Sequence, residues 1–186
     1  MCIRDRDVVI GTLQKDWLRQ GLQSNIGQWQ AEVMRKKMKC NVAFQNNGGI
    51  RKDMQAGEIK VRDIWEISPF GNTMNTFTLT GQELQKLLEN WAADGEFMQM
   101  AGITFTYYEN EKRISNVKVG GKKLDLKKRY KAVTNNYVAS QHEKYFGWKP
   151  ADMTEHHILD RDLLIEAVKE QKIISGELIN SIKIQK

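Results

Sequence analysis

The sequence predicts an α+β fold in which helices flank mixed sheets. Segments with helical periodicity alternate irregularly with short runs of β-branched and aromatic residues, without the regular strand–helix–strand order that a parallel sheet requires. The chain of 186 residues fits one domain, and its 40% hydrophobic and 28% charged residues are ordinary for a globular protein. It contains no run of about 18 apolar residues, the length that a membrane span needs.

The first predicted elements are a short strand and a helix. Residues 8–11 form an apolar, β-branched run, whereas residues 12–23 show no clear pattern. Ser24 or Asn25 can cap a helix that runs to about Met38, because a side-chain oxygen just before a helix accepts a free backbone N–H. The apolar residues at helical spacing in this segment are Ile26, Trp29, Val33 and Met34.

A second strand, residues 41–45, leads into the loop Asn46-Asn47-Gly48-Gly49-Ile50-Arg51. The two glycines let the backbone turn and approach a ligand closely, and the arginine carries a fork of donors that suits phosphate or carboxylate. An ordinary turn with a surface arginine explains these residues equally well, since glycine pairs commonly mark turns. The loop on its own therefore leaves both interpretations open.

The next segment combines a short helix, a turn and a strand. Residues 61–67 are predicted to be helical, with Ile64 and Trp65 facing inward. The turn Pro69-Phe70-Gly71-Asn72-Thr73 then presents an aromatic ring and an amide two residues apart. Residues 73–79 alternate and are rich in threonine and aromatic residues, which is typical of a strand.

A long helix follows this strand. Thr80 and Glu83 have the spacing of a capping box, and Gly95 ends the helix that they begin. Residues 103–107 and 130–134 are predicted to be further strands. The apolar stripe of the helix is Leu84, Leu87, Leu88 and Trp91.

Residues 114–119 and 122–124 are predicted to pair as a hairpin across a Gly-Gly turn. The surrounding stretch, residues 112–131, is rich in lysine and arginine, with Asp125 as its single acidic residue. Such a stretch can bind nucleic-acid phosphates, or it can be a solvated hairpin whose edge lysines block further strand pairing. Few aromatic residues are interleaved, so we favour the hairpin and attribute the net charge of +6 to a lysine-rich surface.

The last predicted helix begins with a cap at Asp160 and runs through Lys169. Cys2 and Cys40 are far apart in sequence and do not have the spacing of a metal site, and Cys40, next to a strand, is predicted to be a buried thiol. The core face of the last helix is predicted to be Leu163, Leu164, Ala167 and Val168.

The segment Met1-Cys2-Ile3-Arg4-Asp5-Arg6 resembles translated adapter sequence at the ends of metagenomic gene models. It lacks the apolar core of a signal peptide. We therefore expect residues 1–6 to be an artefactual leader and residues 7–186 to form a single domain. We also expect that an upstream segment, such as a secretion signal or a further domain, is missing.

The sequence offers no catalytic centre of its own. A metal-dependent phosphohydrolase needs a cluster of His, Asp and Asn around two metals, and neither His142 nor the pair His156-His157 stands in such a motif. Neighbouring histidines point in different directions on a helix or a strand, so we expect all three to face solvent. We predict no catalytic residue, no metal ligand and no cofactor in this chain.

Two ordered motifs carry a family resemblance. The stretch NNGGIRKDMQAGEIKVRDIWEISPFGNT resembles the N-x-G-G-I-R and P-F-G-N pattern of the 5'-nucleotidase and UDP-sugar hydrolase family in its C-terminal, substrate-binding domain. The segment Y-K-A-V-T-N-N-Y-V-A-S resembles a later strand of that domain, so that the resemblance covers about residues 24–172. It implies a layered α/β/β/α arrangement, a metallophosphatase domain elsewhere and an extracytoplasmic location, periplasmic or at the cell surface.

The resemblance also implies a binding site for a nucleotide. Asn46 and Arg51 are expected to face the phosphate and sugar, with Gly48 and Gly49 shaping the loop between them. Phe70 is expected to stack on the base and Asn72 to hydrogen-bond near it. For the second aromatic wall the resemblance points to Tyr145, or to Phe146 by a shift of one residue.

Three positions depart from the family pattern. A phosphate-contacting arginine of the family is replaced by Leu22, and Arg19 is the nearest substitute. A G-G-D-G run before the second aromatic is replaced by Gln141–Lys144, so the glycines of the family pattern are absent from this side of the pocket. Asp152 lies where the family can place a ribose-binding carboxylate.

Two functions follow as expectations. The first is the nucleotide-binding domain of a 5'-nucleotidase-type phosphohydrolase in nucleotide catabolism, which binds a nucleoside monophosphate beside a metal domain and is inactive alone. The second is a non-catalytic module that binds a nucleotide or another anion in a degenerate pocket. For either function we expect neither a nucleic-acid partner nor a membrane span.

Overall fold

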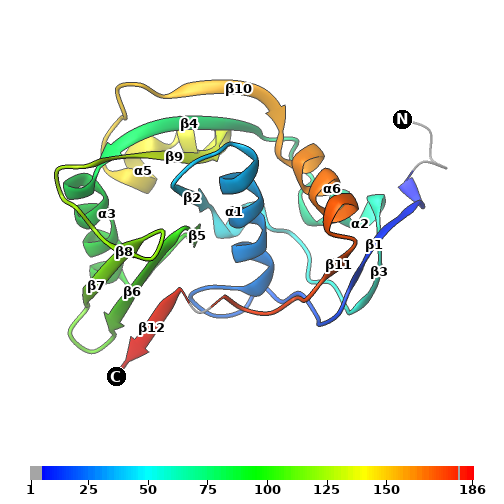
Figure 1. Cartoon of the computed structure of the whole chain (residues 1–186), viewed down its shortest axis with the longest axis horizontal. Coiled ribbons are helices and arrows are strands. Elements are labelled where there is room, and N and C mark those ends of the chain that lie inside the picture. Colours follow the sequence, from blue (N-terminus) through cyan, green and yellow to red (C-terminus); the bar gives the residue numbers. More distant parts are fainter. Residues whose placement is uncertain (1–5, 180) are drawn as a thin grey trace.

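Five strands at the centre of the molecule form a mixed sheet in the order β10-β4-β9-β2-β5 (Figure 1). In the computed structural model, which describes residues 6–179 and 181–186, β2 runs parallel to β9 and the other pairings are antiparallel. The predicted α+β class is confirmed, because helices pack against mixed sheets without βαβ order. The strands of this sheet are β2 (Val42–Gln45), β4 (Thr73–Thr80), β5 (Gln99–Ala101), β9 (Arg129–Asn135) and β10 (Thr154–Leu159).

Two smaller sheets flank the central one. The first has the order β12-β6-β7-β8, and the second has the order β11-β1-β3. The strands of the first are β6 (Ile103–Tyr108), β7 (Arg113–Val119), β8 (Lys122–Lys123) and β12 (Ile182–Gln185). The strands of the second are β1 (Val9–Leu13), β3 (Gly57–Lys60) and β11 (Ile173–Ile174).

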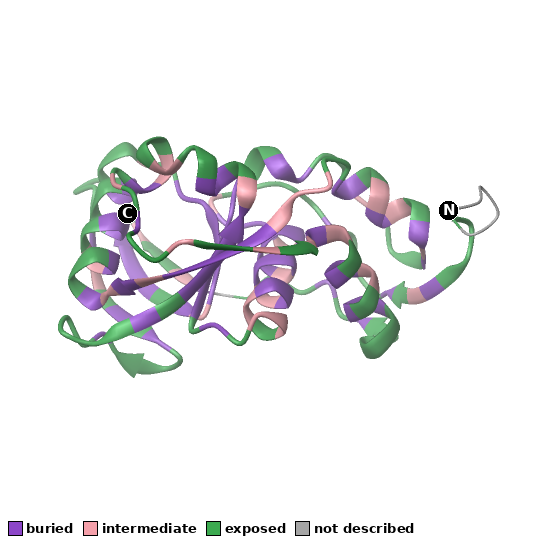
Figure 2. Cartoon of the chain, turned by 90° about the horizontal axis from the view of Figure 1, so that it is seen from above, coloured by how far each residue is buried: buried purple, intermediate pink, exposed green. Residues whose placement is uncertain are grey.

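The alternation of side chains along the central strands divides the core in two. On β2, Val42 and Phe44 pack into one hydrophobic cluster with α3 (Gly81–Asp94) and the four-stranded sheet. Ala43, between them, packs into the other cluster with α1 (Asn25–Lys37). Figure 2 shows the central strands buried on both faces, with exposed residues on the outer sides of the helices. Because the central sheet is covered on both faces, the C-terminal end of β2 and the N-terminal end of β4 are held rigidly. The candidate site lies at these two strand ends.

The predicted helix boundaries are close to the observed ones. Ser24, of the two candidates, is the N-cap of α1, since its hydroxyl accepts a bond from the Gly27 N–H at 3.0 Å. The Thr80 and Glu83 capping box begins α3, and Gly95 ends it in a left-handed conformation with φ of 74°. The remaining helices are α2 (Val61–Ile67), α4 (Asn136–Ser140), α5 (His142–Phe146) and α6 (Asp160–Gln171).

One local prediction, the cap of the last helix, is wrong. The N-cap of α6 is Leu159, and Asp160 is the first helical residue. Its carboxylate accepts bonds from the Ser68 hydroxyl and from the Arg161 N–H, so it ties two segments together and caps no helix. Ile64 and Trp65 both face inward, as predicted: Ile64 is buried, and Trp65 packs against the same core cluster with its half-buried ring under the guanidinium of Arg161, 3.6 Å from the ring centroid. Short elements without a strong sequence pattern were not predicted, namely β3, β5, β10, β11, β12, α4 and α5.

The buried carboxyl of Asp160 gives a pH-dependent prediction. Burial raises the pKa of Asp160 above its ordinary value, although bonds from Ser68 and Arg161 act in the opposite direction. The folded chain therefore binds this proton more readily than the unfolded chain, and the ionised group destabilises the fold at neutral pH. Asp160→Asn is expected to raise the free energy of unfolding at pH 7, with a gain that shrinks as the pH falls toward 3.8, the ordinary value.

Urea unfolding between pH 4 and 8 measures this effect. Asp94→Asn is the matched control, since Asp94 is an exposed aspartate at the end of α3 and is not among the groups that act on Asp160. A pH-independent difference between Asp160→Asn and the unchanged chain would contradict the assignment.

The surface agrees with the hairpin interpretation of residues 112–131. β7 and β8 pair across the predicted turn, β8 forms an edge of its sheet, and every lysine and arginine of the stretch is exposed. Cys40 is a buried free thiol, as predicted, and burial raises its pKa. Residues 1–5 of the expected leader lie outside the described residues, so that prediction stays open. Within the described part, no helix is long and apolar enough to cross a membrane.

Candidate functional site

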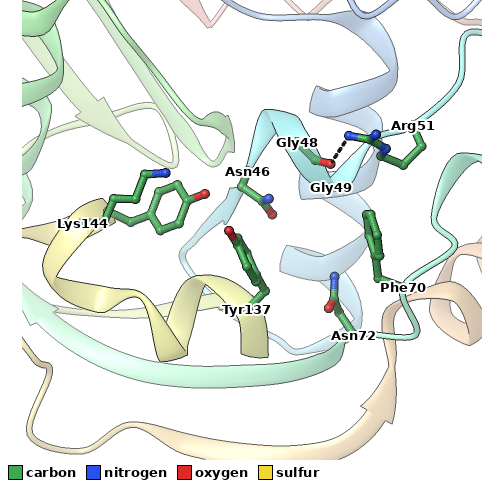
Figure 3. A pocket seen from close by; sticks show the side chains of 9 residues that line it. Asn46, Gly48, Gly49, Arg51, Phe70, Asn72, Tyr137 and Lys144 are labelled. Atoms are coloured by element: carbon green, nitrogen blue, oxygen red, sulfur yellow. Dashed lines mark hydrogen bonds between the residues drawn. The ribbon is translucent and has the colours of Figure 1, made fainter.

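The loop after β2 and the turn before β4 border the same cavity, which has a volume of about 590 Å³ (Figure 3). This size lies within the range of small-molecule sites, roughly 300–1,000 Å³. Seven of the residues expected at the site line it, together with two that were not expected there, Tyr137 and Lys144. These seven are Asn46, Gly48, Gly49, Arg51, Phe70, Asn72 and Tyr145.

The loop after β2 is a single 3₁₀ turn, Asn47–Gly49. Neither of its glycines has a positive φ, so conformational freedom is not the reason for them. A Cβ on Gly49 would lie 2.8 Å from Gln45 Nε2 and 2.9 Å from Asn46 Oδ1, distances that close packing does not allow. Gly48 is exposed and leaves the backbone open toward the cavity. Gly49 therefore provides room for the side-chain amides packed against it.

A chain of buried amides fixes the side chain of Asn46. Asn135, the last residue of β9, donates from Nδ2 to Asn46 Oδ1 at 2.8 Å and to Gln45 Oε1 at 3.0 Å. Its own Oδ1 accepts the Val138 N–H at 2.8 Å and so caps α4. With Oδ1 of Asn46 occupied in this way, its Nδ2 group is left as a donor at the cavity wall. Asn135 is thus bonded to the loop and also caps the helix that carries Tyr137.

Arg51 lies at the exit of the loop and reaches back over it. Its backbone N–H donates to the Ile67 carbonyl at 2.9 Å, and Nη1 donates to the Gly48 carbonyl at 3.3 Å. Within the described residues Arg51 has no ion pair, whereas its neighbour Lys52 pairs with Glu66. Most of the guanidinium fork is therefore free to bind an anion at the cavity mouth.

Phe70 and Asn72 stand on the turn between α2 and β4. The Phe70 ring is 59% exposed, and its centroid lies 5.8 Å from the Arg51 guanidinium carbon. Asn72 accepts the Asp160 N–H through its backbone carbonyl at 2.8 Å, which anchors the turn and leaves its side chain at the cavity. An exposed aromatic face beside a cation and an amide is suited to a flat, polar ring.

The opposite wall consists of two tyrosines. Tyr145, on α5, and Tyr137, on α4, form an edge-to-face pair with ring centroids 6.3 Å apart. Burial raises the pKa of Tyr145 and the neighbouring Tyr137 raises it further, whereas the Asn46 side chain acts in the opposite direction. Phe146, the alternative for this wall, is 1% exposed and packs on Phe77 in the core. α5 turns Tyr145 toward the cavity and Phe146 away from it, so only the first can contact a ligand there.

Other candidates lie outside this lining. Arg19 pairs with Asp53, Nε to Oδ1 at 2.9 Å, and donates weakly to the Ile50 carbonyl. Asp152 accepts the Thr78 N–H at 2.9 Å; burial acts to raise its pKa, but this bond and the Arg129 charge outweigh it, so the pKa is lowered. Neither residue contributes to the cavity wall.

The three histidines do not form a cluster. His157 is exposed, as predicted, whereas His142 is half-buried and His156 shares a hydrogen bond of 2.6 Å with the Thr76 hydroxyl. The prediction that all three face solvent is therefore wrong for His142, whose Nδ1 is buried, and for His156, which is held against β4. In residues 6–179 and 181–186, no three His, Cys, Asp or Glu side chains are grouped so that they could hold a metal ion.

Solved structures share this fold over almost the whole chain. The 5'-nucleotidase precursor of Thermus thermophilus superposes with a TM-score of 0.84 at 25% identity, over 98% of this chain and 40% of that one. The NAD nucleotidase of Haemophilus influenzae gives the same TM-score at 23% identity, again over 98% of this chain and 39% of the other. The chain has the fold of one part of a nucleotidase.

The sequence comparisons identify the family. The family model "5'-nucleotidase, C-terminal domain" matches residues 9–148, and the chain belongs to this family. The 5'-nucleotidase of Vibrio cholerae is 32% identical over 127 residues, which are 66% of this chain and 23% of that protein. The trifunctional nucleotide phosphoesterase YfkN of Bacillus subtilis is 30% identical over 80% of this chain and 11% of its own length. The chain spans less than a quarter of these relatives' length.

Proposed function

We propose that this chain is the nucleotide-binding domain of a 5'-nucleotidase-type phosphohydrolase that takes part in nucleotide catabolism. The observation that carries the proposal is the meeting of Arg51, Phe70 and Asn46 in one cavity, although their loops are about twenty residues apart. A cation, an exposed aromatic face and a fixed amide donor are the groups that bind phosphate, base and sugar. Membership of the family supports the same assignment.

Each group has one role in this proposal. The Arg51 guanidinium pairs two phosphate oxygens, and the Asn46 amide donates to the phosphate and sugar side. Phe70 stacks on the base, Asn72 bonds to its edge, and Tyr145 bounds the other side. Gly48 and Gly49 keep the backbone close to the ligand.

Catalysis in this proposal belongs to a partner domain. A metallophosphatase domain, fused to this chain or separate, holds the divalent metals and delivers the attacking water. The chain itself supplies substrate contacts and no metal ligand. An extracytoplasmic location, periplasmic or at the cell surface, belongs to the same proposal.

Nucleotide titration of the purified chain tests the proposal. AMP, adenosine and ribose 5-phosphate are titrated with and without Mn²⁺ or Zn²⁺, and intrinsic fluorescence is followed. AMP is expected to bind weakly and more tightly than either fragment, and no phosphate is expected to be released. A folded chain that binds no AMP up to about 1 mM, an affinity weaker than about −4 kcal/mol, would overturn the proposal. Metal-dependent hydrolysis of AMP by the purified chain, if it is lost in Arg51→Ala, would overturn the assignment of catalysis to a partner domain.

A second candidate is a non-catalytic anion-binding module. It is favoured by the loop Gln141–Lys144, which replaces a glycine run with bulkier side chains beside the second wall. This module binds phosphate without regard to the base. Equal affinities for AMP and ribose 5-phosphate, unchanged in Phe70→Ala, support it over the nucleotidase assignment.

Arg51→Lys tests the phosphate contact directly. Lysine keeps the charge but cannot pair two phosphate oxygens with one planar group, so AMP affinity is expected to fall about tenfold. The free energy of unfolding should change by less than about 0.5 kcal/mol, because the side chain is exposed and unpaired within the described residues. Arg62→Lys, an exposed arginine paired with Asp7, is the matched control. An unchanged AMP affinity would make Arg51 an ordinary surface residue.

A further inference from the structure

The cavity contains two cations and no carboxylate among its lining residues. Arg51 follows the 3₁₀ turn, and Lys144 stands on α5, whose position in sequence is occupied by glycines in the family pattern. Within the described residues neither side chain forms an ion pair. The neighbouring cations Lys52 and Arg19, in contrast, pair with Glu66 and Asp53.

The two cations lie at opposite ends of the cavity. Figure 3 shows Arg51 beside Phe70 at one end, Lys144 at the other, and Asn46 between them. Each cation is close to an aromatic ring: the Arg51 guanidinium carbon is 5.8 Å from the Phe70 centroid, and Lys144 Nζ is 5.4 Å from the Tyr145 centroid. A cation is attracted to the face of an aromatic ring. Because Phe70 and Tyr145 both line the cavity, this attraction holds the two positive charges near it. A single phosphate bound at Arg51 therefore leaves a second positive charge unmatched.

We propose that the cavity is built for a nucleotide with two anionic groups separated by its sugar, one bound by Arg51 and the other by Lys144. The inference rests on the proposed function and deepens it by naming the class of ligand. The adjacent phosphates of a nucleoside diphosphate do not meet this requirement, because both lie on the same side of the sugar. A nucleoside 3',5'-bisphosphate does meet it, since the ribose holds its two phosphates apart.

The test compares three probes, AMP, ADP and adenosine 3',5'-bisphosphate, by calorimetric titration at low and moderate salt. The bisphosphate is expected to bind about fivefold more tightly than AMP, with a preference that falls as salt screens the lysine, whereas ADP shows no comparable gain. Lys144→Gln is expected to reduce the preference for the bisphosphate to about one. Lys144→Arg is expected to keep it. Lys149→Gln removes the same charge at an exposed position outside the cavity and should leave the preference intact.

The outcomes separate the two proposals. AMP binding without a gain for the bisphosphate overturns the inference alone, as does a preference that survives in Lys144→Gln. A gain for ADP equal to that for the bisphosphate also overturns it, because adjacent charges would then suffice. Absence of binding by all three nucleotides overturns the proposed function as well. Equal unfolding midpoints for the variants show that each comparison is made on folded protein.

Discussion

Replacing Asn135 by alanine is expected to lower the free energy of unfolding by about 2–4 kcal/mol and to weaken nucleotide binding together with it. The side chain is 0% exposed and makes three hydrogen bonds. Its removal takes away the cap of α4, which is worth about 1 kcal/mol. It also leaves the buried oxygens of Gln45 and Asn46 without a donor, at about 1–3 kcal/mol in total. Chemical denaturation and AMP titration measure the two effects.

Two further variants separate stability from positioning. Asn135→Asp keeps the size and the cap but presents an oxygen to Asn46, so the Asn46 amide is expected to flip and offer its carbonyl to the ligand. AMP affinity should then fall by more than the loss of stability explains. Thr80→Ala removes the cap of α3, which lies outside the cavity lining, and should cost stability without changing affinity. An Asn135→Ala chain as stable as the unchanged one would show that the amide chain does not hold the loop.

Replacing Phe70 by alanine is expected to weaken AMP binding by about 1–3 kcal/mol, the usual value of an aromatic stacked on a base. The ring is 59% exposed and touches little of the core, so the free energy of unfolding should change by less than about 0.5 kcal/mol. Phe70→Tyr keeps a stacking face and should retain most of the affinity. The measurement is AMP titration beside urea unfolding.

Leu126→Ala is the control for Phe70, because Leu126 is a similarly exposed apolar residue outside the cavity. It should leave AMP binding unchanged. If Phe70→Ala binds AMP as well as the unchanged chain does, the base lies elsewhere. Loss of ribose 5-phosphate binding in the same variant would point instead to a changed position of Arg51, whose guanidinium lies beside the ring.

Features that depend on residues close together in the sequence were predictable. The Thr80 and Glu83 capping box and the Gly95 stop act within a few residues, so their spacing alone located α3. The seven nominated site residues follow mainly from two short motifs at strand ends, where a rigid sheet presents a loop in one orientation. Their meeting in one cavity was an expectation that only the three-dimensional arrangement could test.

Features that depend on distant partners were not predictable. Asp160 has the residue type of a cap, yet its carboxylate bonds to Ser68, far away in sequence, and the cap position falls on Leu159. Whether Tyr145 or Phe146 faces the cavity depends on how α5 is rotated about its axis. The two are neighbours on this helix, so a shift of one residue would exchange their orientations. Asparagine is a favoured N-cap residue, so Asn135 could have indicated a helix start. No helix was predicted over residues 136–140, and the cap was therefore missed.

The parallel pairing of β1 with β11 has a consequence for biosynthesis. Thr12 lies opposite Ile173, so the first strand of the domain obtains a neighbour from nearly the other end of the sequence. During translation, β1 remains without this neighbour until residue 173 has left the ribosome. Strands that must wait for distant partners fold slowly and expose their edges meanwhile. Slow refolding, with one edge of β1 exposed until β11 pairs with it, is therefore expected from the topology of this small sheet.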